Sequence, residues 1–186
     1  MVTGFAQAIT PLRKATADGD TVALHWLTVL GTAEDTKAIG AATMALPDAA
    51  ARCAALARYG HPAVLPTLVR WMEGDDAVQA HAAGQAFMRI TGTDLRGERR
   101  TLPVPDDADE IDREMAPLVW MPDAAKAKHL LDKRGGEQAG TRWCAGRRMD
   151  WPLAAEDLAA LDLQARWDAA ARCVRRAPDC APPPIV

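Results

Sequence analysis

The chain has few aromatic residues and no long apolar segment. Aromatic residues make up 5% of its 186 residues, and no run of eighteen apolar residues occurs, so we expect no membrane-spanning helix. The first residues lack the basic start and apolar centre of a signal peptide, so a cytoplasmic location is the expectation. Alanine supplies much of the apolar fraction, and alanine favours closely packed helices.

Neither sign of charge dominates the chain. The formal net charge is −3, which gives no overall attraction to nucleic acid. Residues 103–125 nevertheless hold seven acidic residues against one basic residue, and residues 126–148 hold seven basic against two acidic. We expect the acidic segment to fold back on the basic one, with a charged docking surface as the alternative.

Sequence signatures of catalysis and metal binding are also missing. None of the four cysteines forms a CxxC pair, and GxSxG, HExxH and phosphate-binding glycine loops do not occur. Cys53 shares a helix face with Leu56 and Ala57, where a buried thiol is the simplest interpretation. Cys173 and Cys180 could pair only in an oxidising compartment. We therefore predict a protein that is not an enzyme, with no catalytic residue, no metal and no cofactor.

What the sequence does contain is a series of helical segments that end in glycine. Gly31, Gly60 and Gly92 each follow an apolar-periodic segment and lie 29 and 32 residues apart, and a helix-pair period near 30 is typical of solenoids. Helices are predicted over the following ranges: 5–17, Thr21–Leu30, Ala33–Leu46, 48–59, from His61 onward, and within Asp75–Leu95.

The segment Asp75–Leu95 has the clearest helical pattern. An acidic pair can cap its start, and Gly92 can end it in the left-handed conformation. Gly84 costs about 1 kcal/mol in a helix relative to alanine, which suggests that a neighbouring helix packs closely there. The face predicted to be buried consists of Ala80, Ala83, Gly84, Phe87 and Ile90.

The regular pattern stops after Gly92. We divide the chain into HEAT-like repeats (1–95), a proline-rich acidic loop (96–122), a C-terminal helical segment packed on the repeats (123–177) and a tail (178–186). The C-terminal segment is predicted to contain helices at Asp123–Arg134, around Trp143, at Ala154–Leu161 and at Gln164–Arg175. On the last of these, one face would hold Trp167, Ala170, Ala171 and Val174. The tryptophans of this half predict a small second core or, alternatively, interface anchors.

Two stretches, ALARYGHPAVLPTLVRWM (55–72) and DDAVQAHAAGQAFMRITG (75–92), resemble HEAT-like repeats of the kind also found in phycobilisome lyases. More narrowly, AGQAFMRITGTDL followed by the proline-rich segment and TRWCAGRRMDWP resembles an uncharacterised family of proteobacterial HEAT-repeat proteins, some encoded near type VI secretion genes. The resemblance implies an all-α fold, an α-solenoid, and an accessory, adaptor or immunity role. It implies no catalytic residue, and HEAT repeats alone do not define lyase chemistry.

We therefore expect a scaffold or adaptor that binds a protein, with no membrane contact, and the resemblance implies a secretion effector or apparatus component as that protein. The predicted binding residues are Arg70, Trp71, Glu73, Trp120 and Arg147. Of the histidines, His81 is the only candidate functional residue. Nucleic acid is the less favoured partner; the residues that would bind it are Arg96, Arg99, Arg100, Arg147 and Arg148. A homodimer through the N-terminal helix is a further hypothesis.

Overall fold

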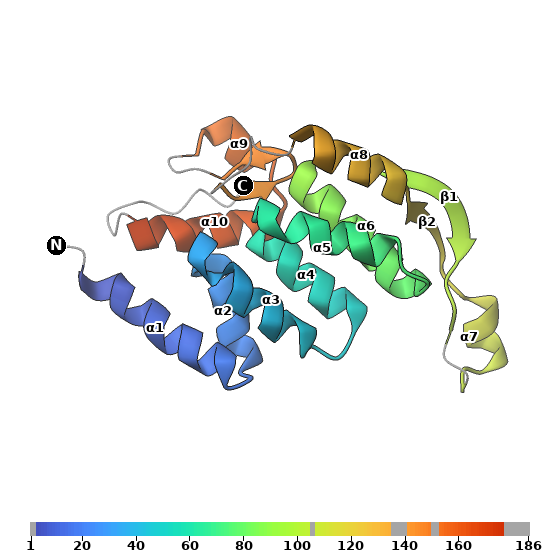
Figure 1. The fold of residues 1–186 in the computed structure, drawn as a ribbon, viewed down its shortest axis with the longest axis horizontal. Helices are drawn as coiled ribbons and strands as arrows, with labels where there is room; N and C mark the ends of the chain where they lie inside the picture. The colour runs from blue at the N-terminus through green and yellow to red at the C-terminus, as the bar shows by residue number, and fades with distance from the viewer. Residues whose placement is uncertain (1–2, 105–106, 135–140, 150–152, 177–186) are drawn as a thin grey trace.

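The computed structural model describes residues 3–104, 107–134, 141–149 and 153–176, and within these ranges it is mainly helical (Figure 1). The α-helices are α1 (Thr3–Ala17), α2 (Thr21–Leu30), α3 (Thr36–Met44), α4 (Ala49–Tyr59), α5 (Leu65–Met72), α6 (Ala77–Thr91), α7 (Glu110–Glu114), α8 (Ala124–Arg134), α9 (Ala155–Ala159) and α10 (Leu163–Arg176). Short 3₁₀ turns, η1 (Ala33–Asp35) and η2 (Pro62–Val64), precede α3 and α5. The strands are β1 (Arg96–Thr101), β2 (Leu118–Pro122), β3 (Trp143–Cys144) and β4 (Arg147–Arg148).

The first six α-helices lie where the sequence predicted them, and their ends follow from local chemistry. The carboxylates of Asp20, Asp48 and Asp76 accept backbone N–H bonds at the starts of α2, α4 and α6. Gly60 and Gly92 end α4 and α6 with φ of 64° and 67°, the left-handed conformation that glycine adopts without strain. The sequence therefore specifies this half of the molecule almost residue by residue.

Helices α2 to α6 share one apolar core, and Ile9 of α1 packs with Val29 and Leu30 of α2 in a smaller cluster. Helix α4 packs against both α2 and α6, α1 packs against α2 and α3, and α5 packs against α6. The largest fully buried side chains include Tyr59 and Phe87, which come from α4 and α6. The predicted buried face of α6 is confirmed, since Ala80, Ala83, Gly84, Phe87 and Ile90 are all buried. None of the described helices is both long and apolar enough to cross a membrane.

The segment predicted to be a proline-rich loop is instead largely structured. Strands β1 and β2 pair antiparallel, and α7 lies between them in sequence. We call β1, α7 and β2 together the arm. The close approach predicted at Gly84 is real, but its neighbour is a strand: a Cβ at Gly84 would lie 2.4 Å from the Cβ of Pro122 in β2. Strand β1 could not be predicted from the sequence, because all of its residues are exposed and it has no apolar alternation.

A second correction concerns Trp143, which lies in a strand and not in a helix. Strands β3 and β4 form a tight hairpin whose turn residues, Ala145 and Gly146, have φ of 50° and 75°. This hairpin with the residue before it (142–148) is called here the capping hairpin. It lies against the C-terminal ends of three helices, so it completes structure that begins far away in the sequence.

The contacts of the capping hairpin converge on the row of periodic glycines. The guanidinium of Arg142 donates hydrogen bonds to the carbonyl oxygens of Thr28 (2.6 Å), Val29 (3.0 Å) and Gly31 (2.5 Å) at the end of α2. The N–H of Trp143 donates to the carbonyl of Gly60 at 2.7 Å. The N–H groups of the two turn residues donate to the carbonyls of Arg89 (2.6 Å) and Ile90 (3.1 Å) in α6. One short segment thus satisfies carbonyls at three helix ends.

The last helices, α9 and α10, correspond to the predicted final pair. The described buried residues of α10 are Ala165, Asp168, Ala169, Ala170 and Cys173. Of the four residues predicted to share one face, Ala170 is buried and Trp167 is exposed, and the side chain of Val174 lies outside the described residues. Helix α10 packs against α2, so the last described helix lies beside the second. The predicted tail (178–186) also lies outside the described residues.

Candidate interaction surface

The base of the arm is fixed to the helical body. Pro122 lies against Gly84, and the ring Nδ1 of His81 in α6 lies 3.1 Å from the carbonyl oxygen of Trp120. The N–H of Asp123 donates to the carbonyl of Leu95 at 2.8 Å, and Leu95 is fully buried in the core. These contacts hold both strands at their body end, and they give His81 a positioning role.

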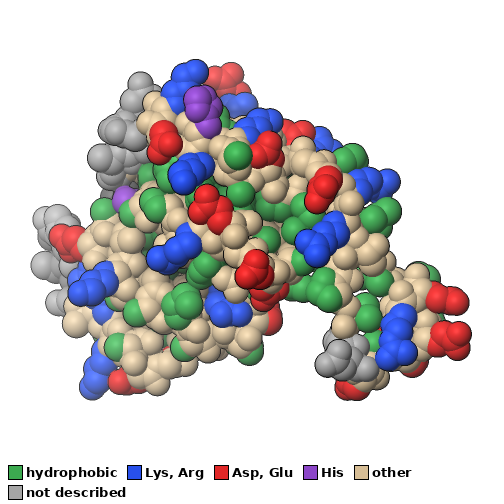
Figure 2. Space-filling view, turned by 45° about the vertical axis from the view of Figure 1, so that its right-hand side comes forward, with side chains coloured by type: hydrophobic (Ala, Val, Ile, Leu, Met, Phe, Trp, Pro, Cys, Tyr) green, Lys and Arg blue, Asp and Glu red, His purple; other side chains and the backbone are tan. Residues whose placement is uncertain are grey.

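Beyond this base the arm leaves the body. Helix α7 lies at the far right of Figure 1, away from α1–α6, and Figure 2 shows the corresponding lobe projecting at the lower right. Every residue of β1 is exposed. Because the arm stands away from the core, its hairpin gains little stability from burial. An isolated two-stranded sheet is only marginally stable in water.

The arm exposes large apolar side chains as well as charge. The exposed fractions are 69% for Ile111, 76% for Met115, 53% for Leu118 and 43% for Trp120. Single exposed apolar residues are ordinary on protein surfaces, but four on one projecting element are typical of an interaction surface. The structure therefore concentrates apolar surface where the sequence predicted a solvated loop.

Cross-strand pairing sorts the arm residues onto two faces. Arg99 pairs with Trp120 and Thr101 with Leu118, so these four side chains share one face. The guanidinium carbon of Arg99 lies 5.2 Å from the centre of the Trp120 ring, a cation–π contact. Arg100 pairs with Val119 and lies on the opposite face.

The predicted binding residues do not gather at one place. Arg70, Trp71 and Glu73 lie at the end of α5, where Glu73 pairs with Lys128 of α8 at 3.7 Å and Trp71 packs partly against the core. Trp120 is on the arm. Arg147 is on the capping hairpin, where its guanidinium pairs with Asp157.

In the described part of the chain, Lys126 and Lys128 of the basic segment bond to residues outside the acidic segment, in contrast to the predicted fold-back. Helix α7, whose sequence is mainly acidic, lies at the arm's far end (Figure 1). Lys128 instead pairs with Glu73, and Lys126 donates to the carbonyl of Asp94 at 2.7 Å. Arg96 forms a bidentate pair with Asp94, whose pKa this pairing holds well below its usual range. These basic residues are therefore engaged by nearer partners.

The cysteine thiols do not resemble activated nucleophiles. Burial raises the pKa of Cys53 to about 11 and raises that of Cys144 above its usual value, so both thiols stay protonated near neutral pH. Cys53 and Cys144 are free, Cys173 is disulfide-bonded, and Cys180 lies outside the described residues. Within the described part of the chain, no group of three or more histidine, cysteine or acidic residues is placed to hold a metal ion.

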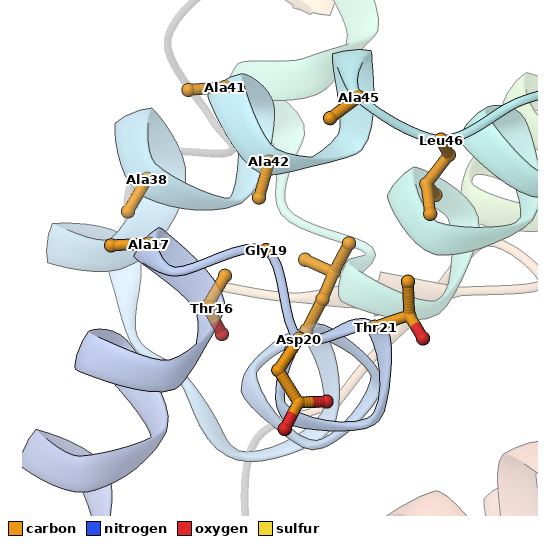
Figure 3. Close-up of a pocket in the computed structure, with 11 residues that line it drawn as sticks. Thr16, Ala17, Gly19, Asp20, Thr21, Ala38, Ala41, Ala42, Ala45 and Leu46 are labelled. Atoms are coloured by element: carbon orange, nitrogen blue, oxygen red, sulfur yellow. The ribbon is translucent and has the colours of Figure 1, made fainter.

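A cavity of about 400 Å³ lies between the turn that joins α1 to α2 and the helix α3 (Figure 3). Its apolar lining includes alanine side chains of α3 and the side chains of Leu24 and Leu46. The carboxylate of Asp20 caps the start of α2, and in Figure 3 it points away from α3. The lining therefore offers a packing gap and no arrangement suited to catalysis.

Comparisons with protein-family models, with curated proteins and with solved structures found no match for this chain. The arm's role consequently rests on its own geometry. Sequence inspection selected Trp120 but missed Ile111, Met115 and Leu118, which share the projecting surface. The signal that could have found β2 is the short apolar run Leu118–Pro122, bounded by Pro117 on one side and an acidic helix cap on the other.

Proposed function

We propose that this protein is a non-enzymatic adaptor that binds another protein through its arm. The observation that carries the proposal is the exposure of Ile111, Met115, Leu118 and Trp120 on an element that projects from the body. Tryptophan beside an arginine is a frequent combination at the energetic centre of protein interfaces. Because the base of the arm is fixed to the body, binding of a partner would cost little conformational entropy for ordering the arm.

The proposal includes a HEAT-like α-solenoid for the first six helices. Its support is the pairwise packing of α1 with α2 and α5 with α6, together with α4 between α2 and α6. Strand β2 packs on α6, and helix α8 packs on α5. In this interpretation, β2 and α8 occupy the position at which a further helix pair of the solenoid would stack. The arm and α8 would then close the array and project from its end.

The resemblance in the sequence suggests the class of partner. It implies a type VI secretion effector or apparatus component, with the protein as an accessory, adaptor or immunity factor in the cytoplasm. A disulfide at Cys173 is a feature of oxidising compartments, so precipitation of cells in acid, followed by alkylation of thiols in denaturant, provides the check on location. Labelling of all four cysteines supports the cytoplasm, and a pair that is labelled only after reduction contradicts it.

Nucleic acid has less support as a partner. Two of the arginines that it would use already have carboxylate partners: Arg96 pairs with Asp94 and Arg147 pairs with Asp157. Breaking these contacts would oppose the gain from phosphate binding.

The test is affinity capture from a native extract with three forms of the full chain. These are the unmodified protein, a double variant Leu118→Ser/Trp120→Ala, and a matched control, Arg100→Ala, on the opposite face of the arm. We expect a protein that the unmodified chain and the control retain and the double variant loses. Recovery of the same proteins by all three forms, or of none by the unmodified chain, would contradict the proposal.

A further inference from the structure

The two halves of the arm carry opposite charge. Strand β1 contributes Arg96, Arg99 and Arg100 against a single Glu98, and all four are exposed. Helix α7, with its capping Asp109, contributes Glu110, Asp112 and Glu114 against the single Arg113. Arg96 is paired with Asp94, so the shaft of the arm is basic through Arg99 and Arg100, whereas its tip is acidic. Both lie within one element that stands away from the body (Figure 2).

The tip carries a small amphipathic face. At about 100° per residue, Ile111 and Met115 lie four residues apart on one side of α7. Asp112 and Glu114 flank this apolar pair on its two sides, whereas Arg113 lies opposite it. A partner for α7 should therefore present apolar surface with a positive charge beside it.

One face of the shaft has the required composition. Leu118 and Trp120 supply exposed apolar surface, and Arg99 lies over the indole ring on the same face. This face cannot be covered by the tip of its own arm, because α7 lies at the other end of the same strands (Figure 1). The tip of a second arm that runs in the opposite direction has no such restriction.

We propose that two copies of this chain associate through their arms, with the tip of each arm on the shaft of the other. Ile111 and Met115 of one copy cover Leu118 and Trp120 of the second, and Asp112 and Glu114 approach Arg99. A twofold axis between antiparallel arms makes both contacts at once, so the interface is self-complementary and closes at two copies. This proposal rests on the assignment of the arm as the docking element and names its occupant.

Sedimentation equilibrium of the purified full chain tests the proposal without any other protein, so its failure is distinct from a failure of the capture experiment. The design uses charge reversal on each half of the arm. One variant is Arg99→Glu, the other is Asp112→Lys/Glu114→Lys, and the control is Arg100→Glu on the opposite face.

We expect the unmodified chain and the control to form dimers. Each charge-reversed variant alone should dissociate with a constant raised by at least about tenfold, because both contacts then bring like charges together. An equimolar mixture of the two variants should dimerise again, since every reversed residue then meets a residue of opposite charge. A misfolded variant would not be rescued in this way, so the mixture separates loss of fold from loss of contact.

A monomer at concentrations up to about 1 mM would overturn the proposal. A dimer that persists in both charge-reversed variants would overturn it as well, because the interface would then lie elsewhere, for instance on the N-terminal helix. Failure of the mixture to dimerise when each variant is separately monomeric would have the same effect.

Discussion

The molecule contains two β-hairpins that have opposite relations to its helices. The capping hairpin has strands of two residues each, yet its backbone and Arg142 bond to the ends of α2, α4 and α6. The arm has strands of six and five residues, yet it touches the body mainly at its base. The length of a hairpin thus says little about its structural importance here. What matters is whether it satisfies polar groups that the rest of the fold leaves open.

The largest difference in stability between the two hairpins should appear when Arg142 of the capping hairpin is replaced by alanine. The variant Arg142→Ala loses three hydrogen bonds to the end of α2 and the stacking of the guanidinium over Tyr59 at 4.8 Å. We expect a loss of about 3 kcal/mol in the free energy of unfolding, measured by urea denaturation. Arg100→Ala on the exposed shaft is the matched control and should change stability by no more than about 0.5 kcal/mol. Equal effects of the two substitutions would show that the capping hairpin does not hold the helix ends.

The base of the arm can be tested with a pair of helix glycines. Gly84→Ala would place a Cβ 2.4 Å from Pro122, so α6 and β2 must separate, and we expect a loss of about 2 kcal/mol. Gly40→Ala in α3 meets nothing within 4 Å and should instead stabilise the protein by about 0.5–1 kcal/mol through helix propensity. Thermal unfolding of both variants gives the sign. A neutral Gly84→Ala would mean that the arm is not seated on α6.

Substitution of the arm's tryptophan should affect binding far more than folding. Trp120 is partly exposed and has Arg99 over its ring, so Trp120→Ala should cost no more than about 1 kcal/mol of stability. Phe87→Ala, which opens a cavity in the core beneath, should cost about 4 kcal/mol in the same urea assay. A comparable loss in both variants would make Trp120 a structural residue and weaken its assignment to an interface.

The smallest expected effect is a dependence of the free energy of unfolding on pH, caused by a histidine that lies near the capping hairpin. His61 is buried, its Nδ1 accepts a hydrogen bond from the N–H of Ala63, and burial followed by the charge of Arg142 lowers its pKa. As the pH falls below about 6.5, the unfolded chain takes up a proton before the folded chain does, so the free energy of unfolding should decrease.

The measurement compares urea denaturation at about pH 7.5 and about pH 5.5 for the unmodified chain, His61→Asn and His25→Asn. Asparagine at position 61 keeps a side-chain acceptor for the N–H of Ala63 but does not titrate. The pKa of His25 is also lowered, by burial and then by Arg58, so each substitution should remove part of the pH dependence. An unchanged dependence in both variants would assign it to other groups.

Much of the helical half could be predicted from the sequence because its signals are local. The capping carboxylate of Asp76, the apolar spacing from Ala80 to Ile90 and the terminal Gly92 all lie within one segment, and all three were confirmed. The occupant of the gap at Gly84 could not be predicted, because it is a proline 38 residues away on a strand with little apolar alternation. Trp120 was selected as a surface residue, but its grouping with Ile111 and Met115 depends on how the arm projects.

The three glycines that suggested a repeat show which features the sequence determines and which the tertiary structure determines. Their spacing is a property of the sequence, and it correctly marks three helix ends. Gly60 and Gly92 adopt the left-handed conformation that other residues resist, whereas Gly31 has an ordinary φ of −57°. Only the tertiary structure reveals that residues 142–146 lie against all three ends, with Arg142 and backbone N–H groups bonded to carbonyls at or near them. The physical reason is that a carbonyl without an intrahelical partner at a helix end can accept a hydrogen bond from any donor that the fold brings near. The sequence shows where donors are needed but not which distant residues provide them.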